Sequence, residues 1–128
     1  MAKSQRHRLG DLQLRIMKIL WDRGEVSVSD VHEALYVDDR LAYTTVATML
    51  RKMEARGLVR HRADERRFIY RAAVSAEAVT QSMSHDVVDR LFEGSLTDMV
   101  SHLLETREVS RAELAELERL ITERRKRR

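Results

Sequence analysis

The chain has 128 residues, a length that suits one small domain, or one domain with an appended segment, and that leaves little room for a large enzyme core. It contains no cysteine, which excludes disulfides, thiolate metal sites and cysteine nucleophiles and suits the reducing environment of the cytoplasm. Charged residues make up 35% of the chain with a net charge of +3, aromatic residues make up 5%, and proline is absent. That composition favours helices with solvated outer faces, so we expect a mainly α, cytoplasmic protein.

Two helices are predicted at the start of the chain. Apolar residues recur at helical spacing over residues 9–23, and Gly24 follows as a stop signal. Ser27 and Asp30 have the spacing of a capping box, in which the hydroxyl accepts a hydrogen bond from an otherwise unpaired amide at a helix start. The second helix is therefore expected over residues 28–36.

A third helix is predicted from about Tyr43, and Gly57 provides the left-handed residue that commonly follows a helix end. One side of this helix is apolar and should be buried, at Val46, Met49, Leu50 and Met53. The other side carries threonines and then cations, at Thr44, Thr48, Arg51 and Lys52. Glu and Lys pairs would solubilise an ordinary exposed face better, so this side indicates a partner other than water.

A two-stranded hairpin should follow the third helix. Residues 58–62 and 67–72 are rich in β-forming side chains and flank a polar turn at residues 63–66. That turn has no Gly or Asn, so its type is not evident from the sequence. Before the second helix, residues 25–28 allow only a very short strand.

Helical periodicity returns in the last part of the chain. Three helices are predicted over residues 76–92, 95–105 and 111–125, and Ser110 with Glu113 makes a second capping box. Their leucine-rich stripes expose more apolar surface than so small a segment can cover alone, so we expect a homodimer. The expected dimer residues are Leu96, Met99, Val100, Leu103, Leu114, Leu117 and Ile121.

Positive charge is concentrated around the third helix and the hairpin. Residues 1–73 hold 15 Lys or Arg and 10 Asp or Glu, whereas residues 74–128 hold 9 and 11. Eight of the cations and three of the anions lie between Arg51 and Arg71. Three helices followed by a basic hairpin is the order of a winged helix-turn-helix, whose third helix enters the major groove of DNA. We therefore predict a winged-helix DNA-binding domain at residues 1–73 and a helical dimerisation domain at residues 74–128.

Other classes of function explain the sequence less well. A winged helix can dock a protein partner without sequence-specific DNA binding, although such a module does not need the basic stretch. Catalysis is not expected, because no nucleophile with a base and no phosphate-binding loop is evident. The five histidines are scattered, so neither a metal site nor a cofactor is predicted. No apolar run approaches the roughly 20 residues that cross a bilayer, so no membrane partner is expected.

Six stretches spread over nearly the whole chain carry a family resemblance. They are LGDLQLRIMKILW, VSVSDVHEAL, AYTTVATMLRKMEARGLV, RRFIYRA, LFEGSLTDMVSHLLE and SRAELAELERLI. Taken together, they resemble the penicillinase and methicillin-resistance repressor family of bacterial winged-helix regulators. The resemblance implies a homodimeric repressor that binds a pseudo-palindromic operator in double-stranded DNA, with β-lactam resistance among the functions that the family regulates.

The resemblance also implies which residues contact DNA. It places them on the third helix and on the hairpin, at Tyr43, Thr44, Thr45, Thr48, Arg51, Lys52, Arg66 and Arg67. Tyr43 stands where several relatives have proline. Ala42 lacks the hydroxyl that caps this helix in some relatives.

Members of this family differ in how their repression is relieved. Some relatives are inactivated by a protease that cuts an Asn-Phe bond in a C-terminal helix, and the corresponding residues here are His102 and Leu103. The motif is therefore not matched at either residue. Copper-responsive relatives use a C-terminal cysteine cluster, which this chain lacks. The sequence leaves open an inactivating protease that cuts at residues 102–103 and, alternatively, induction by a ligand.

Overall fold

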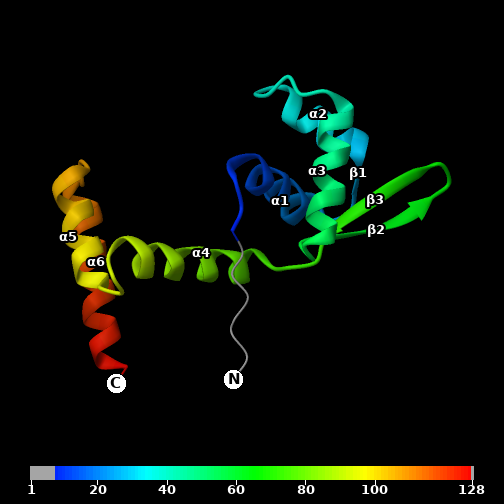
Figure 1. Cartoon of the computed structure of the whole chain (residues 1–128). Helices are drawn as coiled ribbons and strands as arrows, with labels where there is room; N and C mark the ends of the chain where they lie inside the picture. Colours follow the sequence, from blue (N-terminus) through cyan, green and yellow to red (C-terminus); the bar gives the residue numbers. More distant parts are fainter. Residues whose placement is uncertain (1–7, 128) are drawn as a thin grey trace. The chain divides into compact units, whose positions relative to one another are not determined.

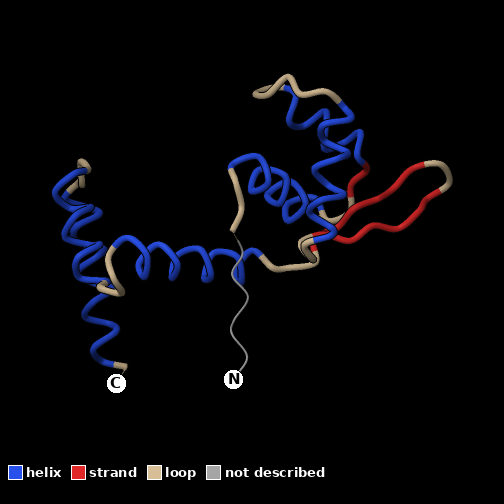
Figure 2. The backbone as a smooth tube through the Cα atoms, in the orientation of Figure 1, coloured by secondary structure: helices blue, strands red, loops and turns tan. Residues whose placement is uncertain are grey.

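A computed structural model describes residues 8–127 of the chain. The chain divides into two compact units, with the boundary between Ser84 and His85. Figure 1 shows the order of the elements, and Figure 2 shows that helices predominate while all the strands belong to the first unit. The mainly α architecture that the sequence predicts is confirmed.

Three helices form most of the first unit: α1 (Asp11–Arg23), α2 (Val28–Tyr36) and α3 (Tyr43–Ala55). α1 ends at Gly24, whose φ of 89° suits a residue without a Cβ atom. α2 begins at the predicted capping box, where the Asp30 amide donates to the Ser27 hydroxyl at 3.1 Å. α3 is followed by Gly57 with a φ of 81°. The glycine stops after α1 and α3 and the capping box at the start of α2 are therefore confirmed.

The strands form one antiparallel sheet in the order β1-β3-β2. Its members are β1 (Val26–Ser27), β2 (Val59–Asp64) and β3 (Arg67–Ala72). β2 and β3 are the predicted hairpin, and residues 59–72 are called the wing below. The very short strand β1 pairs with β3, with Val26 opposite Tyr70. Backbone hydrogen bonds therefore join the wing to the segment that leads into α2.

The wing turns through two residues, Glu65 and Arg66, which lie between the paired residues Asp64 and Arg67. Glu65 has a φ of 58°, a left-handed conformation that glycine adopts more readily than other residues. The turn therefore belongs to the types that need a positive φ at their first central residue. The strand ladder on both sides, rather than favourable turn residues, holds this tip in shape.

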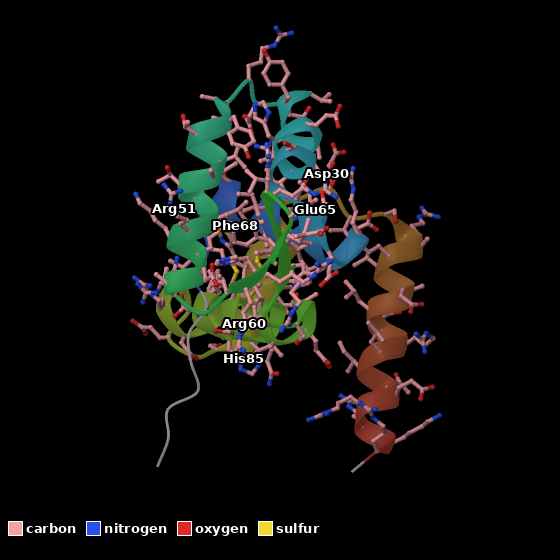
Figure 3. The ribbon with its side chains drawn as sticks, turned by 90° about the vertical axis from the view of Figure 1, so that its right-hand side faces the viewer. Asp30, Arg51, Arg60, Glu65, Phe68 and His85 are labelled. Carbon is pink, nitrogen blue, oxygen red and sulfur yellow. The ribbon has the colours of Figure 1, made fainter. Side chains whose placement is uncertain are left out.

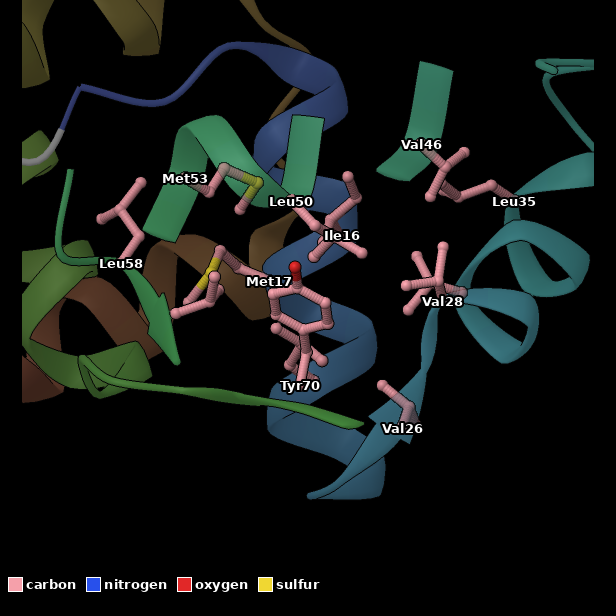
Figure 4. Close-up of a cluster of buried hydrophobic side chains, with 13 residues drawn as sticks. Ile16, Met17, Val26, Val28, Leu35, Val46, Leu50, Met53, Leu58 and Tyr70 are labelled. Atoms are coloured by element: carbon pink, nitrogen blue, oxygen red, sulfur yellow. The ribbon is translucent and has the colours of Figure 1, made fainter. Parts of the chain in front are cut away.

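The core of the first unit lies between its three helices and the sheet. Thirteen buried side chains form one apolar cluster, which Figure 4 shows. Ile16 of α1 and Leu50 of α3 are fully buried, and the ring of Tyr70 reaches into the same cluster from β3 with 1% of its surface exposed. Each such side chain contributes about 2 kcal/mol by leaving water, so the cluster fixes α3 and the wing against the rest of the unit.

The remaining helices are α4 (Ala76–Leu91), α5 (Leu96–Thr106) and α6 (Arg111–Lys126). α5 and α6 begin at serines, since the Ser95 hydroxyl accepts from the Asp98 amide and the Ser110 hydroxyl from the Glu113 amide, both at 3.0 Å. Neither α5 nor α6 contains a fully buried residue. The second unit therefore has no closed core of its own among its described residues.

The two compact units divide inside α4, whereas the predicted domain boundary falls between residues 73 and 74. The start of α4 belongs to the first unit, where Val79 is buried to 1% exposure. Just before α4, the indole N–H of Trp21 donates to the carbonyl of Val74 at 2.9 Å. The division at residue 73 stays a prediction about domains.

Candidate nucleic-acid interface

The outer side of α3 carries most of the residues predicted to contact DNA. Thr44, Thr45 and Lys52 are exposed, and Thr48 is half-buried. Together with Met49 they line an open hollow of about 280 Å³ along the helix. Hydroxyl groups, methyl groups and an ammonium group on one helix face are suited to phosphates, thymine methyls and base edges in a major groove.

A second hollow, of about 250 Å³, joins α3 to the wing. It is lined by Val28, Tyr43, Ala47, Arg51, Arg66, Arg67, Phe68 and Tyr70. The structure thus brings Arg51 of the helix together with Arg66 and Arg67 of the wing tip, although 15 residues separate the first two in the sequence. In Figure 3, Arg51 lies on α3 and Phe68 on the neighbouring strand. Three guanidinium groups around one hollow favour the binding of phosphate groups.

Within the basic stretch, Arg51 donates to the Thr48 hydroxyl at 3.4 Å and Arg67 lies 3.9 Å from a carboxylate oxygen of Asp64, and two other cations are held by partners that are distant in the sequence. Arg56 donates to the side-chain oxygen of Gln13 at 3.2 Å and to the carbonyl of Arg8 at 2.7 Å. Arg62 binds both carboxylate oxygens of Glu25, at 3.2 and 3.0 Å. These two arginines stabilise the unit itself, so the number of cations in the sequence overstates the charge that is free to meet a ligand.

The Arg62 guanidinium also changes the acidity of its partner. Its hydrogen bonds, and then its charge, lower the pKa of Glu25 below the ordinary value for a carboxyl group. The Tyr70 hydroxyl changes in the opposite sense, because burial, followed by the nearby charge of Glu54, raises its pKa. Both groups therefore keep their usual charge states at neutral pH.

His61 holds the base of the wing against α3. Its Nδ1 lies 2.6 Å from a carboxylate oxygen of Glu54, near the end of the helix. Its ring also contacts two aromatic rings of β3, with centroids 4.3 Å from Phe68 and 5.3 Å from Tyr70. Sequence reasoning missed Glu54 and Phe68, because neither the helix period nor the strand period shows that they meet at His61.

The start of α3 is held by packing rather than by a side-chain cap. Ala42, at the cap position, provides no side-chain hydrogen bond, as the sequence indicates. Tyr43, which is 47% exposed, instead contacts the ring of His32 edge to face at 5.8 Å. The Nε2 atom of His32 in turn lies 2.8 Å from the carbonyl oxygen of Leu41. α2 therefore fixes the first turn of the predicted recognition helix.

The residues predicted to form a dimer fall into two groups. Leu96, Val100, Leu114 and Ile121 are exposed, whereas Met99, Leu103 and Leu117 are half-buried. Two further exposed leucines, Leu104 and Leu120, belong to the same helices and were not predicted. Their spacing from Val100 and Leu117 was a signal that could have identified them. The assignment of all these residues to a dimer interface stays a prediction.

The residues that match the proteolytic site of some relatives lie within α5. His102 is exposed and Leu103 is half-buried, and the carbonyl of His102 accepts a hydrogen bond from the Thr106 hydroxyl at 2.8 Å. A helical backbone is not extended as a protease requires, so cleavage here would first need local unfolding. Within residues 8–127, no three His, Asp or Glu side chains converge as metal ligands, and no helix is long and apolar enough to cross a membrane.

Comparison with known proteins gives consistent matches. The model of the family described as Penicillinase repressor matches residues 9–123. The penicillinase repressor of Bacillus licheniformis is 26% identical over 115 residues, which cover 90% of each chain. The transcriptional regulator BlaI of Mycobacterium tuberculosis is 45% identical over 64 residues, which are 49% of this chain and 46% of that protein. The solution structure of the DNA binding domain of the repressor BlaI has a TM-score of 0.52 at 21% identity, over 59% of this chain and 93% of that one, which confirms the winged-helix fold.

Proposed function

The chain belongs to the penicillinase repressor family, and we propose that it acts as a homodimer on a pseudo-palindromic operator in double-stranded DNA. It is a DNA-binding transcriptional repressor, and its relative from Bacillus licheniformis is named a penicillinase repressor. Its place of action is then the cytoplasm, where the DNA is. Among the genes it regulates we place genes of β-lactam resistance, because the name of that relative specifies a penicillinase as its target.

One observation carries the proposal for the first unit. Arg51 of α3 and Arg66 and Arg67 of the wing tip line a single hollow beside the threonines of α3. A recognition helix reads base edges, while a wing contacts the flanking backbone, so this arrangement matches both tasks. Thr44, Thr45, Thr48 and Lys52 are proposed to meet the major groove, and Tyr43 to set the start of the helix.

The second unit supports the proposed dimer. α5 and α6 expose Leu96, Val100, Leu104 and Ile121, and neither helix has a fully buried residue within the chain. A second copy would cover these side chains and would place two winged helices on one duplex. Proteolysis at residues 102–103 remains one candidate for induction, and binding of a ligand is the other.

Selection of binding sites from random duplexes, followed by footprinting of the full chain, tests the proposal. We expect two half-sites related by a dyad and spaced by about one helical turn or a multiple of it. Protection of a single half-site at full affinity by a monomer would contradict the homodimer. Absence of any selected sequence would instead favour a winged helix that docks a protein partner.

A second experiment separates the roles of the cations. Replacing Arg66 and Arg67 with Ala should weaken binding to all duplexes and flatten the salt dependence by roughly two units for each protomer of the dimer, one for each lost phosphate contact. Thr48→Ala or Arg51→Ala should instead change which operator sequence is preferred. Lys18→Gln with Arg23→Gln, which removes the same charge from α1, is the control and should change neither property. Equal losses on operator and random DNA for the α3 variants would mean that base reading lies elsewhere.

A further inference from the structure

Two arginines face each other across the two strands of the wing. Arg60 of β2 and Arg71 of β3 are directly paired in the antiparallel ladder, and both are exposed. Side chains of directly opposed residues project from the same face of a sheet with their Cβ atoms about 5 Å apart. The fold therefore keeps two positive side chains next to each other.

This pair lies on the face of the wing that is turned away from α3. The neighbouring pair in the ladder is His61 with Tyr70, and it faces inward, because His61 contacts Glu54 of α3 and Tyr70 is buried in the core. Successive residues of a strand point to opposite faces, so Arg60 and Arg71 project outward. Figure 3 shows Arg60 low on the wing, apart from Arg51 on α3.

Arg62 projects from the same outward face, two residues along β2 from Arg60. We call Arg60, Arg62 and Arg71 the outer wing face. Arg62 is held by Glu25 through two hydrogen bonds, and the charge of Arg71 is the smallest of the causes that shift the pKa of Glu25. Neither Arg60 nor Arg71 forms an ion pair within residues 8–127.

The unpaired arginines work against the stability of the wing. Like charges directly opposite each other destabilise an antiparallel pair of strands. Glu25, whose carboxylate interacts with the charge of Arg71, already has a hydrogen-bonded partner in Arg62, so it compensates this repulsion only in part. An anion bound between the two guanidinium groups would remove it, and a phosphate group has the oxygen geometry that arginine binds in a bidentate manner.

We propose that the outer wing face binds backbone phosphates of the duplex that flanks the operator. The inference rests on the proposed function, which places the operator against α3 and the tip residues Arg66 and Arg67. The flanking duplex would then lie on the side of the wing opposite α3, which is the side that Arg60 and Arg71 face. These two arginines then add affinity that depends on DNA length and not on operator sequence.

The test compares two duplexes that carry the same selected operator. One covers only the footprint, and the other extends it by about 20 base pairs, or roughly two helical turns, on each side. The full-length protein should bind the longer duplex more tightly. Replacing Arg60 and Arg71 together with Gln should abolish that gain and should lower the salt slope on the longer duplex by roughly two units for each protomer that makes the contact. Binding of this variant to the shorter duplex should not change. Because the shorter duplex carries only the operator, binding to it tests the proposed function separately from the contact with flanking DNA.

Thermal unfolding provides a second, independent measurement. Removing two repelling charges should raise the Tm of the Arg60→Gln, Arg71→Gln protein by about 2 °C, whereas a merely structural pair would give a lower Tm. Arg71→Glu, which creates an ion pair with Arg60, should also raise the Tm and abolish the length-dependent gain. The control is again Lys18→Gln with Arg23→Gln, which should retain the gain.

Three results would overturn the proposal. Equal losses on both duplexes would place the two arginines in the operator contact itself. An unchanged gain on the longer duplex would show that flanking DNA is not the partner of the outer wing face. It would favour an acidic protein segment as the partner instead. A lower Tm in both Arg71 variants would show that the pair stabilises the wing.

Discussion

The two units of the chain differ in how they cover their apolar side chains. In the first unit, α1, α2 and α3 close on one another and on the sheet, and thirteen side chains form one buried cluster. In the second unit, α5 has an apolar row as regular as any in the chain, but Leu96 is 64% exposed and Leu104 is 42% exposed. The same helical periodicity thus leads to a closed core in one region and to an open apolar surface in the other.

The comparison shows that an amphipathic pattern predicts a covered face without saying which chain covers it. The winged helix covers its faces within one chain and leaves its charged surface for DNA. The C-terminal helices leave their apolar surface exposed, and a second copy would cover it in the proposed dimer. Stability of the first unit should therefore be independent of protein concentration, whereas the second unit should gain stability as the dimer forms.

Removing one leucine from each region tests whether the two units are stabilised in different ways. Leu50→Ala, at a fully buried position of α3, should lower the free energy of unfolding by about 2–5 kcal/mol at any protein concentration. Leu96→Ala should lower the free energy of unfolding by an amount that grows when the protein is concentrated enough to dimerise. Urea unfolding followed by circular dichroism at two protein concentrations measures both. A concentration-dependent loss for Leu50→Ala would contradict a self-contained first unit.

A charge in the exposed apolar row should separate the copies. Leu103 is half-buried within its own chain, so Leu104→Asp is the cleaner change. An unpaired carboxylate in the proposed interface should make the protein monomeric and should lower operator affinity by roughly 10², because two linked half-site contacts are reduced to one. Sedimentation and an operator titration measure the two effects.

The control for that variant is His102→Asp, on the opposite side of the same helix. It should remain dimeric and bind the operator normally. A Leu104→Asp protein that behaved like this control would place the dimer interface elsewhere in the chain.

Helix caps give a smaller contrast between the regions. Serines cap the starts of α2, α4, α5 and α6, whereas α3 starts at Ala42 without a side-chain cap. Ala42 has extended backbone angles that suit a cap, so Ala42→Ser should stabilise the first unit by about 1 kcal/mol. Ser110→Ala should cost the second unit about as much. Chemical unfolding measures both, and a destabilised Ala42→Ser protein would show that Tyr43 and His32 leave no room for the hydroxyl.

The smallest expected effect concerns two exposed ion pairs. Hydrogen bonds from arginine lower the pKa of Glu25 in the first unit and of Glu116 in α6. A lowered pKa contributes stability above the ordinary carboxyl pKa of about 4.3, and that stability is lost as the pH falls through the lowered value. Glu25→Gln should therefore lower the Tm at pH 7 and not in strong acid. Glu116→Gln should change it less, because its partner Arg119 lies in the same helix.

Much of the fold could be predicted from local patterns. The helix periods, the serine caps and the glycine stops all act within a few residues, and the structure confirms the elements that they predict. The conformation of Glu65 could not be predicted, because its positive φ is imposed by the register of β2 and β3 and not by its own preference.

The candidate site was less accessible to sequence reasoning. Arg56 and Arg62 looked equivalent to Arg51 in the basic stretch, yet Gln13 and Glu25 occupy them from 43 and 37 residues away. No periodic pattern shows such long-range pairs. The outer wing face was missed for the same reason, since Arg60 and Arg71 become neighbours only once the ladder sets the register.

Trp21 has a consequence for how this protein can be observed. It is the single tryptophan of the chain, and its indole N–H donates to the carbonyl of Val74, in the segment between β3 and α4. Indole emission moves to longer wavelength when the ring enters water, so the fluorescence of the unlabelled protein reports whether this junction is docked. The reporter lies outside the proposed DNA surface and the exposed leucine rows. Operator binding and dimerisation can therefore each be followed optically for what they do to the segment between β3 and α4, within the first unit, without adding a dye to either surface.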